Sequence, residues 1–190
     1  ALFSEPDIVP LVPDFISGGA EEYKGAARGT AYHRLMECLD YTAVDSENQI
    51  HEQITALTEA KKMAYEEAQC IRIQDIMTFL HSEIGQRMKK AFEENQLYRE
   101  QPFVLAQSMK NIEKDWNGEE TVLVQGIIDA YFIEDEEIVL VDYKTDRVRK
   151  GEEQHLIDLY HTQLEDYAQA LERMLQKKVK ETYIYSFALG

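Results

Sequence analysis

The chain has 190 residues, of which 44% are hydrophobic and 29% are charged. This length and composition predict one globular domain with a sizeable core. The formal net charge of −16 argues against a free-standing DNA-binding protein, because lysine and arginine supply most of the nonspecific affinity for phosphates. No apolar run approaches the ~20 residues that a transmembrane helix needs, and nothing resembles a signal peptide, so we expect a soluble, cytoplasmic protein with no membrane partner.

Residues 1–19 are expected to form a linker. Three of the four prolines of the chain, Pro6, Pro10 and Pro13, fall in this segment. A proline-rich segment that leads into a patterned domain suggests an excised piece of a larger polypeptide. The domain itself is therefore assigned to residues 20–190.

The first half of this domain is predicted to be helical. One helix over residues 20–39 carries Gly29-Thr30-Ala31-Tyr32-His33, and a more polar helix follows over residues 47–68. From Ile73 onwards, apolar residues recur at spacings of three and four, which predicts an amphipathic helix or a broken pair. These helices are expected to supply part of the core.

The two cysteines, Cys38 and Cys70, lie far apart in the sequence and form no Cys-x-x-Cys pair. We interpret them as reduced, packed thiols. Because an iron–sulfur cluster is usually held by four thiolates, no such cluster is expected from this chain by itself.

The second half alternates between strands and one long helix. Pro102 pushes its strand towards a sheet edge or a strand start. Strands are predicted over residues 99–106, 121–132, 138–144 and 182–189, with a helix over residues 154–176. This order predicts an α/β fold with a mixed β-sheet flanked by helices.

Two short motifs lie on one predicted hairpin. Gly126-Ile127-Ile128-Asp129 opens it, Asp142-Tyr143-Lys144 closes it, and the acidic run 134–137 forms its turn. A turn centred on Asp135 and Glu136 sets Asp129 directly opposite Asp142, with Cβ atoms ~5 Å apart, where like charges are destabilising unless a cation offsets them. The turn lacks the Asn-Gly pair that fixes a two-residue loop, so the register can still shift.

The lysine of the second motif joins the same cluster. Because alternate strand residues share a face, Lys144 lies on the same side as Asp142. Two carboxylates and an ammonium in this arrangement suit a metal-dependent phosphodiesterase. The alternative is a solvated sheet edge with acidic residues. Residues 138–141 look buried on both faces, however, and charges at the end of such a strand are unfavourable unless they are paired or bind metal.

Four further residues are candidates for the same site. His33 would complete a nitrogen and oxygen ligand set suited to Mg²⁺ or Mn²⁺, although a single helix histidine is more often structural. Glu100, on the strand expected beside residues 126–132, could bind a metal or its water, or could lie on the surface. Gln163 and Tyr167 are four residues apart on one helix, so they project together and could contact a base, a phosphate or each other.

Arg147, Arg149 and Lys150 follow directly after the motif lysine. In a chain with so much negative charge, these basic residues could contact phosphates. A solvated loop is at least as good an interpretation of the same residues.

Five segments in order carry a family resemblance. They are Gly29-Thr30-Ala31-Tyr32-His33, Glu100 before Pro102-Phe103, Gly126-Ile127-Ile128-Asp129, Asp142-Tyr143-Lys144-Thr145-Asp146, and Tyr160 with Gln163-Leu164-Glu165-Asp166-Tyr167. Each motif alone is weak, but the ordered set resembles the RecB-type nuclease family of the PD-(D/E)XK superfamily.

The resemblance implies a restriction-endonuclease-like core and a set of roles. His33, Asp129 and Asp142, with the Tyr143 carbonyl, would bind Mg²⁺, with Mn²⁺ as a possible substitute. Lys144 would activate the attacking water and stabilise charge on the phosphate. The other site residues, Glu100, Gln163 and Tyr167, would support catalysis, the last two by organising the site and the DNA strand.

The resemblance also implies a biological setting. The chain would be the deoxyribonuclease domain of a bacterial helicase-nuclease that acts in double-strand-break repair by recombination. Helicase domains of the same polypeptide and a partner subunit would hold the DNA, which would explain the acidic charge. An alternative is an inactive nuclease-fold module that docks a helicase or partner, although the intact Asp129, Asp142 and Lys144 count against it. A third, an acidic DNA mimic, rests on net charge alone.

Overall fold

The computed structural model describes residues 8–10, 20–108, 118–145, 151 and 153–189. Arg147, Arg149 and Lys150 lie outside these residues, as does most of the predicted linker. The linker and the domain boundary at residue 20 therefore stay predictions, although Ile8–Pro10 forms a short strand.

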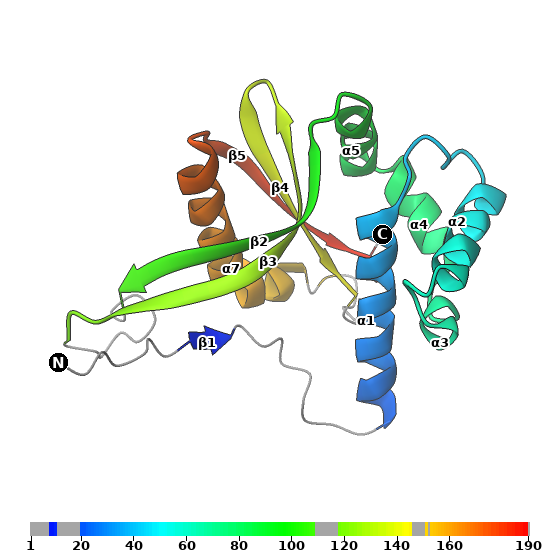
Figure 1. The fold of residues 1–190 in the computed structure, drawn as a ribbon, viewed down its shortest axis with the longest axis horizontal. Coiled ribbons are helices and arrows are strands. Elements are labelled where there is room, and N and C mark those ends of the chain that lie inside the picture. Colours follow the sequence, from blue (N-terminus) through cyan, green and yellow to red (C-terminus); the bar gives the residue numbers. More distant parts are fainter. Residues whose placement is uncertain (1–7, 11–19, 109–117, 146–150, 152, 190) are drawn as a thin grey trace.

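A mixed sheet with flanking helices makes up the fold, as predicted (Figure 1). The strands are β1 (Ile8–Pro10), β2 (Leu97–Ser108), β3 (Thr121–Glu134), β4 (Glu137–Lys144) and β5 (Val179–Ser186). The helices are α1 (Ala20–Cys38), α2 (Glu47–Glu59), α3 (Tyr65–Ala68), α4 (Ile73–His81), α5 (Glu83–Glu93) and α7 (Glu153–Leu175). The order β1-β3-β4-β5 runs across the sheet, and β2 also pairs with β3. The β1–β3 and β4–β5 pairs are parallel and the other two are antiparallel.

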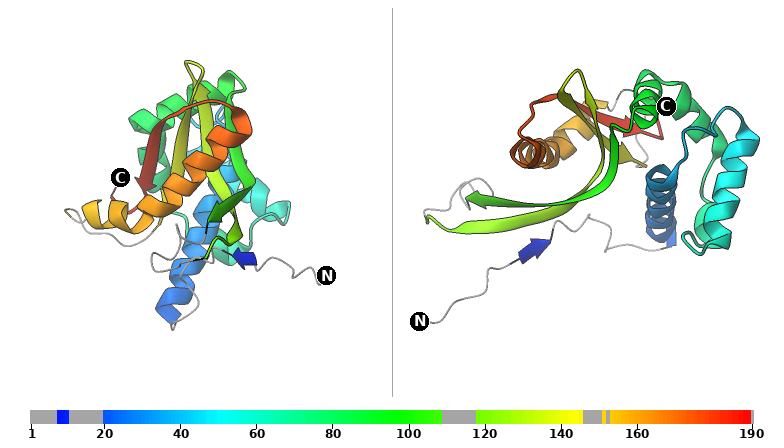
Figure 2. Two further views of the ribbon diagram at one scale, coloured as in Figure 1. Left: turned by 90° about the vertical axis from the view of Figure 1, so that its left-hand side faces the viewer. Right: turned by 45° about the horizontal axis from the view of Figure 1, so that its top comes forward.

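The sheet has a hydrophobic core on each face. Helices α1 to α5 lie on one side and α7 lies on the other (Figures 1 and 2). Strand β4 serves both cores, because Val139 and Val141 pack with the first set of helices while Ile138 and Leu140 pack towards α7. All four side chains are fully buried. This confirms the prediction that residues 138–141 are buried on both faces.

Helix boundaries differ from the predictions in two places. The polar helix predicted over residues 47–68 is interrupted after Glu59, where Lys61 adopts a left-handed φ of 56° and the short α3 follows. The apolar series from Ile73 forms the broken pair α4 and α5, because Ser82 caps α5 by accepting the Gly85 N–H. A Cβ on Gly85 would lie 2.0 Å from the Phe79 carbonyl oxygen, so only glycine permits this close turn.

The β3–β4 hairpin has the predicted register. A two-residue turn is formed by Asp135 and Glu136, which both have positive φ, 52° and 65°. The ladder runs from Glu134 opposite Glu137 to Ala130 opposite Val141. A turn without glycine therefore holds the register that the sequence predicted.

Strand β5 begins three residues earlier than predicted and ends three earlier. It pairs in parallel with β4 from Ile138 beside Val179 to Lys144 beside Ser186. The partner strand thus sets the limits of β5, whereas side-chain alternation alone does not mark them.

In strands β2 and β3, the side chains switch from one face of the sheet to the other at the same pair of facing residues. Alternate side chains of a regular strand share a face, but Ile128 packs on the α7 side while Ala130 packs on the side of α1 to α5. Between them lies Asp129. On β2 the facing residue is Glu100, whose φ of 49° is unusual for a residue other than glycine. The β2–β3 ladder continues on both sides and skips this facing pair.

Two further predictions concern thiols and membranes. Cys38 and Cys70 are free thiols and are partly buried. Among the helices that the structure describes, none has the length and apolar composition to span a bilayer.

Candidate active site

Helix α1 approaches the end of β4 through a glycine. A Cβ on Gly29 would lie 3.3 Å from the Thr145 hydroxyl oxygen, so a larger residue here would push the helix away from the motif strand. One turn later, His33 points at β3, where its Nε2 lies 3.1 Å from Asp129 Oδ2. Residues that are 96 positions apart in the sequence therefore meet at the sheet.

His33 contacts an acceptor with each ring nitrogen. Nδ1 lies 3.0 Å from the Gly29 carbonyl oxygen and Nε2 faces the Asp129 carboxylate. A neutral imidazole has one N–H, so two acceptor contacts favour the doubly protonated ring. Burial lowers the pKa of His33, but the hydrogen bond and charge of Asp129, with smaller contributions from Gly29 and Asp142, raise it to about 9. His33 must lose this proton before it can bind a metal.

Asp129 is held by the neighbouring strand as well. Its Oδ2 accepts the backbone N–H of Tyr143 at 2.8 Å. The β3–β4 ladder ends at Ala130 and Val141, one position short of Asp129 and Asp142. The two aspartates thus occupy the facing positions predicted from the turn, but the Asp129 carboxylate reaches across to the backbone of β4.

Asp142 and Lys144 share a face, as predicted. Lys144 Nζ lies 2.8 Å from Asp142 Oδ2, and the lysine and aspartate side chains are only 14% and 5% exposed. The contact is therefore a close ion pair between two largely buried side chains. Burial and the nearby charge of Asp129 raise the pKa of Asp142 to about 6, although Lys144 and His33 lower it.

Two side chains of helix α7 also contact the ammonium of Lys144. Nζ lies 3.8 Å from the centre of the Tyr160 ring and 3.4 Å from Oε1 of Gln163. One carboxylate, one aromatic face and one amide oxygen therefore fix the position of this charge.

Tyr167 is a packing residue in this arrangement. It is 6% exposed and packs edge-to-face on Phe103, with ring centres 5.1 Å apart. A Cβ on Gly126 would lie 2.8 Å from the Phe103 ring, which explains the glycine of the first motif. Burial raises the pKa of Tyr167, as do Asp142 and Asp129, while a hydrogen bond with Gln163 lowers it. Of the three contacts left open for Gln163 and Tyr167, the one with each other is present.

Glu100 lies opposite Asp129, at the position where the side chains of β2 and β3 switch faces of the sheet. A left-handed φ at a residue other than glycine costs about 1–3 kcal/mol and is often found at functional sites. Burial raises the pKa of Glu100 to about 7, with further increases from Asp129 and Glu37, against decreases from His33 and Arg34. The strand distortion thus brings a third carboxylate close enough to Asp129 for the two charges to repel each other.

The donor set fits a hard divalent cation by its chemistry. Carboxylate oxygens with one imidazole suit Mg²⁺ or Mn²⁺ and are too poor in nitrogen and sulfur for structural zinc. Asp142 is buried beside the charge of Asp129, which raises its pKa in spite of Lys144, so a cation here would relieve repulsion. Within the described ranges, no group of three or more His, Cys, Asp or Glu side chains forms a preformed metal site. Asp129 and His33 would therefore have to exchange their mutual contact for the metal.

Sequence reasoning gave no role to two residues at the site. Arg28 donates to the Thr145 carbonyl at 3.3 Å and lies 3.2 Å from Asp75 on α4, which fastens the end of β4 to two helices. Tyr160, under Lys144, precedes Gln163 by one helical turn, so the spacing of three could have placed both on one face. Arg28 had no such signal, because its partners are 47 and 117 positions away.

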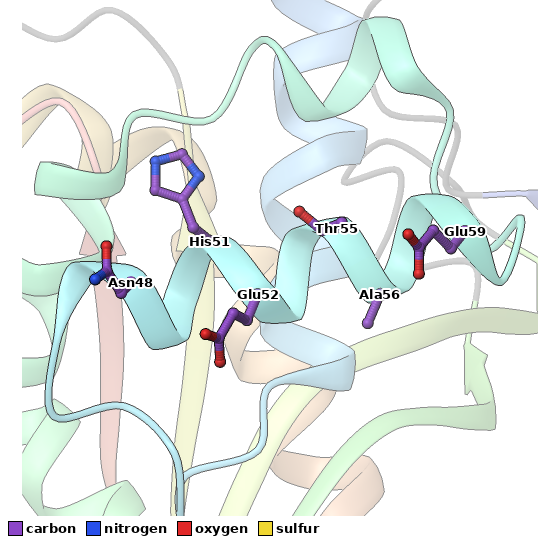
Figure 3. A pocket seen from close by; sticks show the side chains of 6 residues that line it. All are labelled: Asn48, His51, Glu52, Thr55, Ala56 and Glu59. Atoms are coloured by element: carbon purple, nitrogen blue, oxygen red, sulfur yellow. The ribbon is translucent and has the colours of Figure 1, made fainter.

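A surface hollow on α2 lies apart from these residues. Figure 3 shows that its side chains all come from this one helix. They are Asn48, His51, Glu52, Thr55, Ala56 and Glu59. None of the predicted site residues contributes to it.

Comparison with known proteins gives consistent matches. The sequence profile of the PD-(D/E)XK nuclease superfamily matches residues 13–188. An ATP-dependent helicase/nuclease subunit of Clostridium perfringens (strain 13 / Type A) is 37% identical over 182 residues, which is 93% of this chain and 14% of the relative. The corresponding helicase/nuclease subunit of Alkaliphilus metalliredigens (strain QYMF) is 41% identical over 177 residues, 92% of this chain and 14% of the relative. The chain thus spans a small part of the length of these relatives.

Proposed function

The chain belongs to the PD-(D/E)XK nuclease superfamily, and on that premise we propose that it is a metal-dependent deoxyribonuclease that hydrolyses phosphodiester bonds. Mg²⁺ is the proposed ion, with Mn²⁺ as a substitute. The observation that carries the proposal is the buried ion pair of Asp142 and Lys144 beside a second aspartate. A structural module has no need of such an unfavourable cluster of buried charge.

Each proposed metal ligand is positioned by a contact of its own. The Tyr143 N–H holds Asp129, the Gly29 carbonyl orients the ring of His33, and Lys144 lies against Asp142. The Tyr143 carbonyl is proposed as a further ligand from the backbone. Glu100 adds a third carboxylate opposite Asp129. When bound, the divalent cation would lower the pKa of a water molecule and neutralise charge on the phosphoryl oxygens.

Lys144 is proposed to act on the reacting phosphate. Its ammonium is held by Asp142, Tyr160 and Gln163, so it needs little reorganisation to donate to a phosphate oxygen or to the attacking water. A fixed donor aimed at developing negative charge stabilises a transition state more than a mobile one does. Gln163 thus organises the site through Lys144, and Tyr167 does so through its packing on Phe103.

We propose the biological setting from the relatives. The two named relatives are bacterial helicase/nuclease subunits, which supports a domain of an AddAB-type helicase-nuclease in the bacterial cytoplasm. DNA would be held by helicase domains of the same polypeptide and by an AddB-type partner subunit. The proposed process is double-strand-break repair by homologous recombination, with exonuclease-type cutting of the unwound strand.

A cleavage assay tests the enzymatic proposal. The chain is incubated with single-stranded or double-stranded DNA and with Mg²⁺, Mn²⁺ or a chelator. We expect hydrolysis with either metal, none with chelator, and none for Asp129→Ala. Cleavage that persists in chelator, or that Asp129→Ala retains, would contradict the proposal.

Calorimetry separates the enzyme from a docking module. Mg²⁺ or Mn²⁺ is titrated into the wild-type chain and into Asp142→Asn. Binding that disappears in the variant supports the proposed site, whereas equal heats in both chains would favour a module that docks a helicase or partner protein.

A further inference from the structure

A groove whose lining includes three cationic side chains lies beside the candidate site, on the same helix. Its walls come from α1, the turn after α2 and the start of α3, and its volume is about 540 Å³. Thr30 and Arg34 line it from α1, and Lys61, Lys62 and Tyr65 line it from the opposite wall. We call this the α1–α3 groove; Figure 1 shows α3 beside α1.

The charge of this groove contrasts with the chain as a whole. Three cations, Arg34, Lys61 and Lys62, line it together with two carboxylates, Glu66 and Glu67, although the net charge of the chain is −16. One of these carboxylates has a structural task, because Glu67 accepts the Ala64 N–H at 2.9 Å. Arg34 pairs with Glu37 on its own helix. Both lysines are exposed, and neither takes part in an ion pair found among the described residues.

An aromatic side chain stands in the same wall. Tyr65 is 69% exposed, the largest fraction among the large hydrophobic residues that the structure describes. An exposed aromatic ring beside lysines is the combination on which single-stranded nucleic acids bind, with bases stacked on the ring and phosphates on the cations. A structural role does not explain this ring, because it buries little surface.

The groove adjoins the candidate site through two neighbouring stripes of α1. Gly29 and His33 face the motif strand, and Thr30 and Arg34, each one residue later, face the groove. A helix with its side chains is about 10 Å wide. At about 3.4 Å per nucleotide, a few nucleotides are enough to cross α1.

We propose that the α1–α3 groove binds the DNA strand a few nucleotides from the phosphate that is cut, with Lys61 and Lys62 on the phosphates and Tyr65 on a base. This inference rests on the proposed nuclease function, whose substrate it specifies as a single strand. The left-handed φ of Lys61, where glycine is usual, is consistent with a side chain kept for contact.

The test is binding of a fluorescein-labelled 16-nucleotide single-stranded DNA, followed by anisotropy in chelator at several salt concentrations. For Lys61→Ala/Lys62→Ala we expect an affinity about tenfold lower and a log–log salt slope smaller by about 1.4, since each phosphate contact with a single strand contributes about 0.7. For Tyr65→Ala we expect about tenfold weaker binding with an unchanged slope, because stacking releases no counterions.

A matched control removes two lysines elsewhere. Lys177 and Lys178 lie by the hairpin turn, where Lys177 pairs with Glu136. That turn is about 20 Å along the strands from Asp129. Lys177→Ala/Lys178→Ala should change the affinity less than twofold. The proposed DNA-binding role of the groove would be wrong if both double variants lost the same affinity. It would also be wrong if Tyr65→Ala kept the wild-type affinity, or if the wild-type chain did not bind.

The outcomes also separate this inference from the proposed function. Binding in chelator needs no hydrolysis, so groove-dependent binding without any cleavage in Mg²⁺ would refute the nuclease and leave the groove standing. Cleavage in Mg²⁺ with no effect of the groove variants on binding would support the nuclease and refute the groove as a DNA-binding site.

Discussion

The two ends of the β3–β4 hairpin shift the pKa values of their carboxylates in opposite directions. At the turn, Glu134 is bound by Arg87 and Lys180, each with a contact of 2.7 Å. The hydrogen bond from Arg87 and the contact with Lys180 lower its pKa to about 2, although burial raises it. At the other end, burial and Asp129 raise the pKa of Asp142 to about 6 in spite of Lys144. At the turn the paired cations thus outweigh burial, whereas at the site burial and the second aspartate outweigh the paired cation. A bound cation would favour the ionised aspartates at the site.

The largest expected effect comes from removing one lysine at each end. Lys144→Met should lower the rate of DNA cleavage by at least about 10²-fold, because the donor to the phosphate is lost. Lys180→Met, at the turn, should leave the rate unchanged, since its partners are Glu134 and Asp135. Cleavage rates in Mg²⁺ measure both, and thermal unfolding checks that each variant folds. Similar cleavage rates for the two variants would contradict a special role for the Lys144 end of the hairpin.

Added metal should act on the site end alone. Mg²⁺ at 100 times its dissociation constant should stabilise the wild-type chain by about 2.7 kcal/mol. Asp142→Asn should gain nothing, whereas Glu134→Gln should gain as much as wild type. The melting temperature in Mg²⁺ and in chelator gives the measurement. A gain in Asp142→Asn would mean that the cation binds elsewhere.

Without metal, Asp142 should destabilise the fold. Its pKa is about 6 in the folded chain, against an ordinary value of 3.8. The folded state therefore binds more protons between these values, and wild type loses stability as the pH rises towards 6. Asp142→Asn, a neutral substitute, should be more stable by roughly 3 kcal/mol at pH 8. Urea unfolding in chelator at pH 8 and pH 4 tests this, and an advantage that persists at pH 4 would contradict it.

The turn should respond to acid with the opposite sign. Glu134 has a pKa of about 2 in the folded chain and an ordinary value of 4.5, so its stabilisation is present above pH 4.5 and is lost as the pH falls towards 2. Glu134→Gln should lower stability by about 1 kcal/mol at pH 7, because the group is partly exposed and screened. The difference from wild type should shrink in urea unfolding at pH 3, and a constant difference would argue against the ion pairs.

Local patterns in the sequence predicted much of the hairpin and of its site. The acidic turn fixed the pairing of β3 with β4, and the period of two placed Asp142 and Lys144 on one face. The resemblance implied that His33 and Asp129 share a metal ion, but their direct contact was not predicted, because no local pattern joins residues so far apart. The left-handed Glu100 was not foreseen, since a strand reversal arises from packing on two sides of the sheet. The catalytic and metal-binding roles of all the predicted site residues stay predictions.

The reversal of β2 and β3 also bears on how the domain can be re-engineered. Beyond Glu100 and Asp129 the two strands continue as an arm, with Phe103 and Val124 facing α7. A one-residue insertion in the arm would expose this apolar face, whereas two added residues in each strand would preserve it. Neither change alters the β3–β4 ladder on the far side of the reversal. Arm length is therefore a variable that chimeric domains can exchange in steps of two residues without redesigning the carboxylate cluster.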